Sequence, residues 1–453
     1  MRWLHYLCFG LLLVSHQLYA WSDHANLAWP LLSADDALQE KTLAPEPLAD
    51  FVNGQFHAIT QALAEHERWS EEHGHSHALT PASLTFTGDK PDLTEAFVRA
   101  IRINPTLSYE PYRQILLAER PSPDHPDSVG WAELSFLDPG ESHAHTRYLL
   151  LQDTDRVSPA QVLATASDEP DMGMDVGLFA NNGTVFGAEY GFGDQSFGNP
   201  NLSYGSQAPF HMGFYHLDWL TRTAQPGLLR TYPVWRIALY DRLAQVAFKT
   251  GHDYWGWRFM GWALHYIGDL TQPYHAIPLP GISTVAALWM VVNGETDAAI
   301  QRVSNRHGVL ESYQYQRLAA IQRGDMSSAP WAAWIEEAAL SPRQVRPLPP
   351  AAIERQLTRE SVEAAGHLDH ALATYVPYRY VSDAAFEWVG SGYEAEIVEL
   401  VRKAGGDESV EQLDRAILMQ LQRFVGVARG WLSRAQAHSM KSQPIVNSHD
   451  VED

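Results

Sequence analysis

Apolar residues recur every three or four positions along much of the second half of the chain, which is the spacing of one helix face. The pattern predicts helices over 234–249, 255–270 and 413–432, and a further helix over 355–375. Gly251 follows the first of these runs and Pro273 follows the second, at positions where helices commonly end. The second half of the chain therefore predicts a mainly helical fold.

The first half of the chain has a different pattern, with proline and glycine scattered through it and turn signals at 121–126 and 138–141. Short apolar runs at 129–136 and 148–152 are typical of strands, and the glycine-rich stretch 183–205 predicts a long loop. We therefore expect mixed structure in this half. In the second half, the apolar stretch 286–292 is interpreted as core packing, with a membrane-contacting loop as the alternative.

The first twenty residues have the features of a secretory signal peptide. Arg2 precedes an apolar run over 6–14, and the small residue Ala20 stands where cleavage is expected. We therefore expect a secreted or periplasmic protein whose mature chain begins at Trp21. The only cysteine, Cys8, lies in this leader, so the mature chain is expected to have neither a disulfide nor a thiol.

The end of the predicted helix 255–270 carries the residues most suggestive of metal chemistry. His265 and Asp269 are four positions apart, which places them on one helix face where two side chains can share a metal ion. Pro273 has no N–H to donate, so we expect the helix to end there and His275 to lie on the following turn. The alternative is an ordinary ion pair on a helix surface.

A second pair, His307 and Glu311, has the same spacing further along the chain. Its repetition favours a metal site over two chance ion pairs. Histidine nitrogen and carboxylate oxygen donors suit zinc, and a set without thiolates is typical of sites that keep a position open for water or substrate.

Together these features resemble the secreted zinc-dependent phospholipases C and their relatives, the S1/P1-type nucleases. The similarity lies in Trp21 at the expected mature N-terminus with His24 soon after, the run from His265 to His275, the later HxxxE, and a largely helical body. The resemblance implies a mainly α fold, a helical zinc-dependent phospholipase C/P1 nuclease-like bundle. It also implies one catalytic domain over 21–437, with a large insertion over about 26–165 and a polar tail at 438–453.

The resemblance further implies three zinc ions per chain. One of them would be chelated by the α-amino group and carbonyl of the first mature residue, and one carboxylate would bridge two ions. The implied ligands are, ion by ion, Trp21 and His24 with the bridging Asp269; His265 and Asp269 with an upstream Asp and an upstream His; and His275, His307 and Glu311.

Two of the implied ligands have more than one candidate. The segment 166–175 offers Asp168, Asp171 and Asp175, and Asp168 is preferred because family members often place this residue shortly before a proline. Asp168 is also the resemblance-based candidate for orienting or deprotonating the attacking water. For the histidine, both His211 and His216 are kept, and the alternative for either is a buried histidine satisfied by one hydrogen bond.

Other histidine-rich stretches are assigned to structure. The tracts 73–77 and 143–145 alternate histidine with Gly, Ser and Ala, which favours polar surface loops over metal sites. Asp369, between two histidines on the predicted helix 355–375, is interpreted as a local ion-pair partner.

The charge balance bears on the substrate. The chain has 32 basic and 54 acidic residues, a net charge of -22, which repels polyanions at long range. Resemblance and charge together predict a secreted zinc phospholipase C that hydrolyses phosphatidylcholine-like phospholipids to diacylglycerol and a phosphorylated headgroup through zinc-activated water, with transient contact to a membrane surface. The alternatives are an S1/P1-type single-strand nuclease or other zinc phosphodiesterase, and a non-enzymatic secreted zinc-binding protein.

Overall fold

The computed structural model describes residues 23–73, 79–119, 127–139, 143–202, 205–340 and 347–441. Trp21 and the expected cleavage site lie outside these residues. The fold is mainly helical, as the hydrophobic pattern predicts. Among the described residues, no helix has the length and apolar character needed to cross a membrane.

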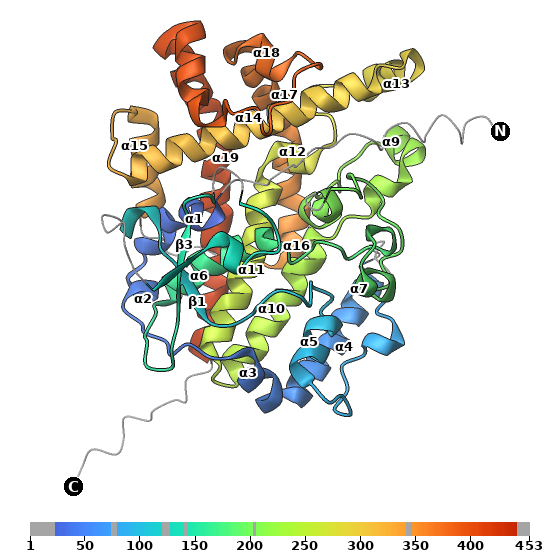
Figure 1. The fold of residues 1–453 in the computed structure, drawn as a ribbon, viewed down its shortest axis with the longest axis vertical. Helices are drawn as coiled ribbons and strands as arrows, with labels where there is room; N and C mark the ends of the chain where they lie inside the picture. The colour runs from blue at the N-terminus through green and yellow to red at the C-terminus, as the bar shows by residue number, and fades with distance from the viewer. Residues whose placement is uncertain are drawn as a thin grey trace, which may run out of the picture.

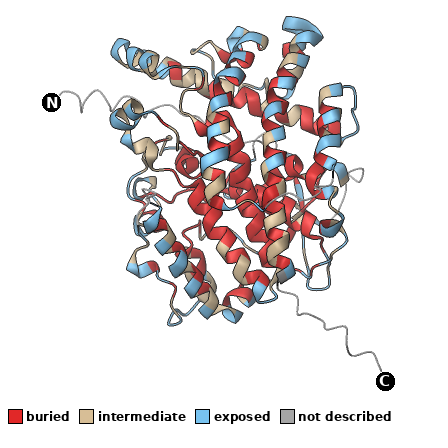
Figure 2. Ribbon diagram, turned by 180° about the vertical axis from the view of Figure 1, so that it is seen from behind, coloured by how far each residue is buried: buried red, intermediate tan, exposed pale blue. Residues whose placement is uncertain are grey.

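Helix α11 (Asp253–Thr271) forms the centre of the molecule. All its residues from Tyr254 onward are buried, and it packs against α10 (Pro233–Lys249), α6 (Pro159–Asp168) and α19 (Ile397–Lys441). Figure 2 shows these buried segments crossing the middle of the molecule. Gly261 permits the close approach of α6, because a Cβ there would lie 2.5 Å from the Cβ of Ala166.

The remaining helices surround this centre. Helix α1 (His24–Ser33) lies on α6, and α14 (Thr296–Gln322), α15 (Ala329–Ala339) and α17 (Thr358–Tyr375) pack on α19. Two helical segments of α19 meet at Gly406, whose φ of 72° interrupts the helix. The shorter helices are α2 (Asp36–Gln39), α7 (Val185–Glu189), α8 (Ala208–His211), α9 (Trp219–Ala224), α12 (Pro273–Ala276), α16 (Pro350–Ala352) and α18 (Tyr378–Val381).

The first half of the chain has the expected mixed structure. It contains α3 (Leu48–Gly54), α4 (Phe56–Glu72) and α5 (Leu93–Ala100), and an antiparallel sheet in the order β1-β3-β2. The strands are β1 (Tyr112–Gln114), β2 (Ser128–Gly130) and β3 (Arg147–Leu150), with Tyr112 paired to Leu150 and Val129 to Tyr148.

The strand predicted over 129–136 is shorter than expected. It ends at Gly130, and a 3₁₀ turn (Trp131–Glu133) follows. The buried Trp131 indole donates a hydrogen bond to the carbonyl of Leu137, which turns the chain back on itself. Tertiary burial of one side chain thus overrides the local strand preference.

The apolar stretch 286–292 does not pack in the core, so that interpretation was wrong. It lies in α13 (Thr284–Asn293), none of whose residues is buried. The side chains of Val285, Trp289 and Val292 are 74%, 67% and 71% exposed. Helix α13 projects from one corner of the molecule, at the beginning of α14 (Figure 1).

Candidate metal centre

Within the part of the chain that the structure describes, three groups of buried histidine and carboxylate side chains lie around the C-terminal end of α11. In each group the possible ligand atoms lie within 4.8 Å of one another, so each could hold a metal ion. The groups are His24, Asp171 and His265; His211, His265 and Asp269; and His275, His307 and Glu311.

The last turns of α11 position the two residues at the middle of this arrangement. His265 and Asp269 are one helical turn apart, and His265 Nε2 lies 3.3 Å from Asp269 Oδ2. The other ring nitrogen, Nδ1, lies 2.9 Å from the carbonyl oxygen of Ser167 and donates to it. This hydrogen bond fixes the tautomer, because it leaves Nε2 as the nitrogen that can bind a metal.

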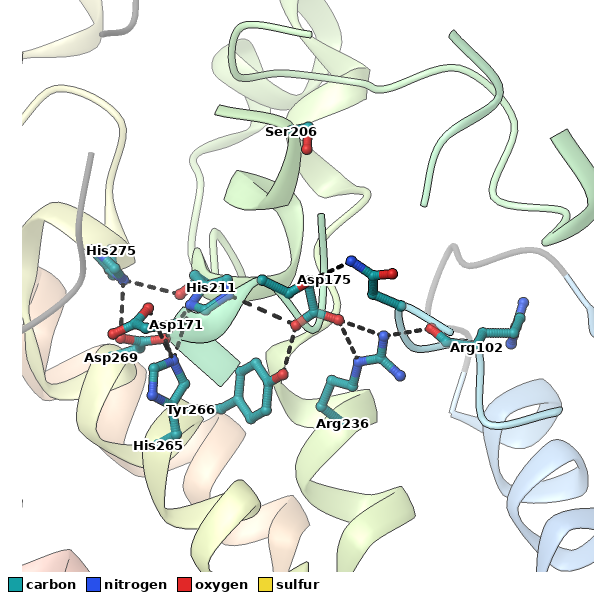
Figure 3. A network of polar contacts seen from close by, with 12 residues as sticks. Arg102, Asp171, Asp175, Ser206, His211, Arg236, His265, Tyr266, Asp269 and His275 are labelled. Atoms are coloured by element: carbon teal, nitrogen blue, oxygen red, sulfur yellow. Dashed lines mark hydrogen bonds and ion pairs between the residues drawn. The ribbon is translucent and has the colours of Figure 1, made fainter. Parts of the chain in front are cut away.

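His211, the last residue of α8, faces the same carboxylate oxygen of Asp269 as His265 does (Figure 3). Its Nδ1 lies 3.0 Å from Asp269 Oδ2 and 3.1 Å from His265 Nε2. Its Nε2 faces Asp175 Oδ2 at 3.7 Å. The His211 ring therefore lies between two buried carboxylates. Asp269 belongs to the same ligand group, and Asp175 lies outside it.

Asp175 is itself held by a buried ion pair (Figure 3). Two nitrogens of the Arg236 guanidinium donate to its Oδ1, and the Tyr266 hydroxyl donates to its Oδ2 at 2.5 Å. Carboxylates behind a histidine ligand orient the ring and raise its basicity. Asp175 is thus placed to orient the His211 ring.

His24 is the first residue of α1, and its ring points towards the end of α11. Its Nε2 lies 3.4 Å from Asp269 Oδ1, and its ring centroid is 4.1 Å from that of His265. Gly268 leaves the space for this ring, since a Cβ there would lie 2.8 Å from His24 Nδ1. The backbone N–H of His24 donates to Asp168 Oδ1 at 2.9 Å, which ties the start of α1 to the end of α6.

The third group joins α12 to α14. His275 Nδ1 donates to the carbonyl of His211 at 3.0 Å, while its buried Nε2 has no hydrogen-bond partner among the described residues. His307 Nε2 lies 2.8 Å from Glu311 Oε1, one turn further along α14. Pro273 does not lead into a plain turn as expected, because it is the first residue of the short helix α12, a position that needs no N–H donor.

The electrostatics differ between the two ends of the site. Burial opposes the charged form of Asp269, yet the facing histidines, His265 foremost, hold the pKa of its carboxyl well below its usual value. Burial likewise opposes protonation of His265, but nearby carboxylates, Asp269 foremost, raise its pKa to about 9. In the third group burial lowers the pKa of His275 to about 4, lowers that of His307 well below its usual value, and raises that of Glu311 well above its usual value.

These shifts have one physical reading. The charged side chains near α11 compensate one another, whereas in the third group the cost of burial outweighs the compensating charge of the neighbouring groups. A divalent cation would supply that charge and would keep Glu311 ionised. The orphaned Nε2 of His275 and the nitrogen and oxygen donors of all three groups fit a metal ion of this kind.

The structure separates the alternatives that the sequence left open. Asp171, rather than the preferred Asp168, belongs to a ligand group, while Asp168 binds the backbone of His24. His211 belongs to a ligand group, whereas the half-buried His216 has its Nε2 2.8 Å from Thr358 Oγ1. Each of the other predicted ligands from His24 onward lies in one of the three groups.

The interpretation of 143–145 as a surface loop was wrong for His143, which is 1% exposed. Its ring stacks on Trp131 with centroids 3.9 Å apart, and its Nε2 lies 3.1 Å from Asp168 Oδ2. Burial opposes protonation of His143, but Asp168 outweighs it and raises the pKa. No sequence signal distinguishes this histidine from its exposed neighbour His145, because the contact forms between segments that only the fold brings together.

Asp369 does not pair locally as expected. The Tyr274 hydroxyl donates to its Oδ1 at 2.8 Å, and the Arg306 guanidinium donates to its Oδ2 at 2.6 Å. The ring of Tyr274 in turn stacks on His307, with centroids 5.4 Å apart and planes 10° from parallel. Asp369 therefore supports one wall of the third ligand group, although it is distant in sequence.

Comparisons with protein-family models, with curated proteins and with solved structures give no match. The functional argument therefore rests on the geometry of the three groups and on the residues around them.

Proposed function

We propose that this protein is a zinc-dependent phospholipase C that hydrolyses phosphatidylcholine-like phospholipids. The observation that carries the proposal is the convergence of three buried ligand groups, two of which share His265. Adjacent metal sites of this kind serve phosphodiester hydrolysis, because neighbouring cations can hold the attacking and the leaving oxygen together.

Zinc is the metal that the donor set favours. The groups combine imidazole nitrogens with carboxylate oxygens and contain no thiolate, a combination that is typical of catalytic zinc. When bound, zinc lowers the pKa of a coordinated water towards neutrality and offsets negative charge on the phosphate.

The residues of the chain contribute orientation and proton handling. Asp171 lies in the ligand group with His24 and His265, so we assign to it the orientation of the attacking water, a role that the family resemblance implied for Asp168. Asp168 has a positioning role, because its two oxygens bind the backbone of His24 and the ring of His143. Asp175 does the same for His211.

Two features favour a phospholipid over a nucleic acid. The net charge of -22 repels a polyanion at long range. In addition, a cavity of about 130 Å³ adjoins the third ligand group, and His307 and Tyr274 form part of its wall. The other lining residues are mostly apolar: Phe197, Met212, Phe214, Leu228, Pro278, Leu279, Ile300, Val303 and Ser304. Such a lining suits the glyceride side of a phospholipid.

The test is release of phosphocholine from phosphatidylcholine by the purified mature protein, before and after removal of metal with a chelator. We expect activity that disappears on chelation and returns with zinc. Digestion of single-stranded DNA or RNA without lipid cleavage would instead identify a nuclease. Zinc binding without turnover of either substrate would identify a zinc-binding protein and would overturn the proposed enzyme.

The variant His307→Ala makes this test sharper, with His216→Ala as its control. His307 belongs to the third ligand group, whereas His216 lies outside the three groups and hydrogen-bonds Thr358. We expect the first variant to lose activity and one zinc equivalent, and the second to keep both.

A further inference from the structure

An apolar surface lies on α13 and the neighbouring α9, outside the ligand groups. It consists of side chains that no other described residue covers: Trp219, Val285, Leu288, Trp289 and Val292. Helix α13 has no charged residue over its ten positions. A solvent-exposed apolar patch of this kind marks a surface that contacts something else.

The two helices that carry this surface are joined at their beginnings. Asp218 caps α9 by accepting from the backbone N–H groups of Leu220 and Thr221. Its other oxygen accepts from the Thr284 hydroxyl at 2.6 Å, and Thr284 is the first residue of α13. The two helices lie at the same corner of the molecule (Figure 1), and we call this projecting part the α9–α13 tip.

Segments next to the tip in sequence line the cavity beside the third ligand group. Leu228 follows α9, and Pro278 and Leu279 precede α13, and all three line that cavity. Ile300 and Val303, in the first turns of α14 directly after α13, line it as well. The segments that flank α9 and α13 in sequence therefore form part of the wall of the cavity that contains His307.

We propose that the α9–α13 tip docks on the surface of a zwitterionic phospholipid bilayer and brings the cavity beside His307 to the lipid. The inference rests on the proposed function, since it names how the same site reaches its substrate.

Three observations favour a bilayer over a protein partner or a second copy of this chain. The tip combines apolar side chains with two exposed tryptophans, a composition that suits the interface between headgroups and acyl chains. Ten residues are too few to span a bilayer but enough to lie in its interface. A stable protein interface engages about 20–30 residues on each side, more than a single projecting helix offers.

Charge specifies the kind of bilayer. The chain carries a net charge of -22, so an anionic membrane would repel it. A zwitterionic bilayer has no net charge and matches the uncharged helix α13. Phosphatidylcholine vesicles are therefore the probe for this inference.

The experiment measures sedimentation of the full mature protein with phosphatidylcholine vesicles in the presence of a chelator, so that binding is separated from hydrolysis. The variants are Trp289→Ala and Val292→Asp, both at exposed positions. The control is Val185→Asp, because Val185 is 79% exposed on α7, which lies well away from α13 in Figure 1.

We expect each tip variant to bind vesicles at least about tenfold more weakly than wild type, and the control to bind normally. The tip variants should also lose hydrolysis of phosphatidylcholine in vesicles, while they still hydrolyse a soluble phosphocholine ester. If the tip variants bind as well as wild type, or if wild type does not bind vesicles, the docking inference is wrong. A protein that binds vesicles through the tip but hydrolyses neither substrate would instead refute the proposed function alone.

Size-exclusion chromatography tests whether the tip instead binds a second copy of this chain. If wild type is a dimer and Val292→Asp is a monomer, the tip is an interface between two copies and the docking inference is overturned. We expect both proteins to elute identically.

Discussion

Asp168 accepts a hydrogen bond of 2.9 Å from the backbone N–H of His24, although the two residues are 144 positions apart. The bond holds the first turn of α1 against the end of α6. The His24 ring then points at Asp269, with His24 Nε2 3.4 Å from Asp269 Oδ1. The second oxygen of Asp168 faces His143 at 3.1 Å. Both oxygens are thus used for positioning, while Asp171 offers its carboxylate to the ligand group.

This division of roles predicts different results for the two aspartates. We expect Asp171→Asn to lose about one zinc per chain and to lose activity, because a ligand group loses its carboxylate. Asp168→Asn should retain its zinc with an affinity reduced by roughly 10–100-fold, the usual effect of removing an outer partner. Zinc content after dialysis against graded chelator concentrations would distinguish them, and equal zinc loss would contradict the assignment.

A second prediction concerns the buried pair behind His211. Asp175→Asn should weaken zinc binding by roughly 10–100-fold and lower the free energy of unfolding by about 3–5 kcal/mol, because Arg236 loses its partner. Asp414→Asn is the matched control, since it also removes a buried partner of an arginine, Arg317, but lies outside the ligand groups.

Isothermal titration with zinc and chemical unfolding of the metal-free proteins would measure both quantities. We expect similar losses of stability in the two variants and weaker zinc binding only in Asp175→Asn. Unchanged zinc affinity in Asp175→Asn would exclude a positioning role for this carboxylate.

A third prediction follows from the protonation of His265. Its pKa of about 9 means that the ring holds a proton at neutral pH in the metal-free protein, and zinc must displace it. The zinc affinity should therefore rise by about tenfold per pH unit between pH 7 and pH 8.5 and level off above pH 9. Titrations in buffers of different ionisation enthalpy should detect the released proton, and a pH-independent affinity would contradict the prediction.

A fourth prediction concerns the metal-free protein at low pH. His275 has a folded pKa of about 4, below the usual value of about 6.5 for the unfolded chain. The unfolded state thus binds more protons between these values, so this histidine lowers the stability of the fold as the pH falls from 6.5 towards 4. Unfolding in denaturant across this range would show the loss, and His275→Gln should reduce its pH dependence.

Local signals predicted a large part of this protein. The helix around His265 and Asp269 follows from the 3.6-residue period, and their common face follows from a spacing of four. The same spacing predicted the pair His307 and Glu311 on α14. Local sequence failed for Trp131 and His143, because their burial depends on the contact between their two rings, which no spacing within a single element specifies.

The exposed helix α13 illustrates the opposite failure. An apolar run is compatible with either core packing or a contact surface, since hydrophobicity records the preference for burial but not the partner. Only the position of α13 at a projecting corner showed that, among the described residues, Val285, Trp289 and Val292 stay exposed.

The sequence by itself determined the helical class and the two helix-borne pairs, because these depend on residue chemistry and on spacing within one helix. The tertiary structure decided that Asp171 and His211 join the ligand groups, that Asp168 and His143 stand behind them, and that α13 is exposed. These relations join residues far apart in sequence, and their distances are set by how α6, α8 and α11 pack, which no local pattern encodes.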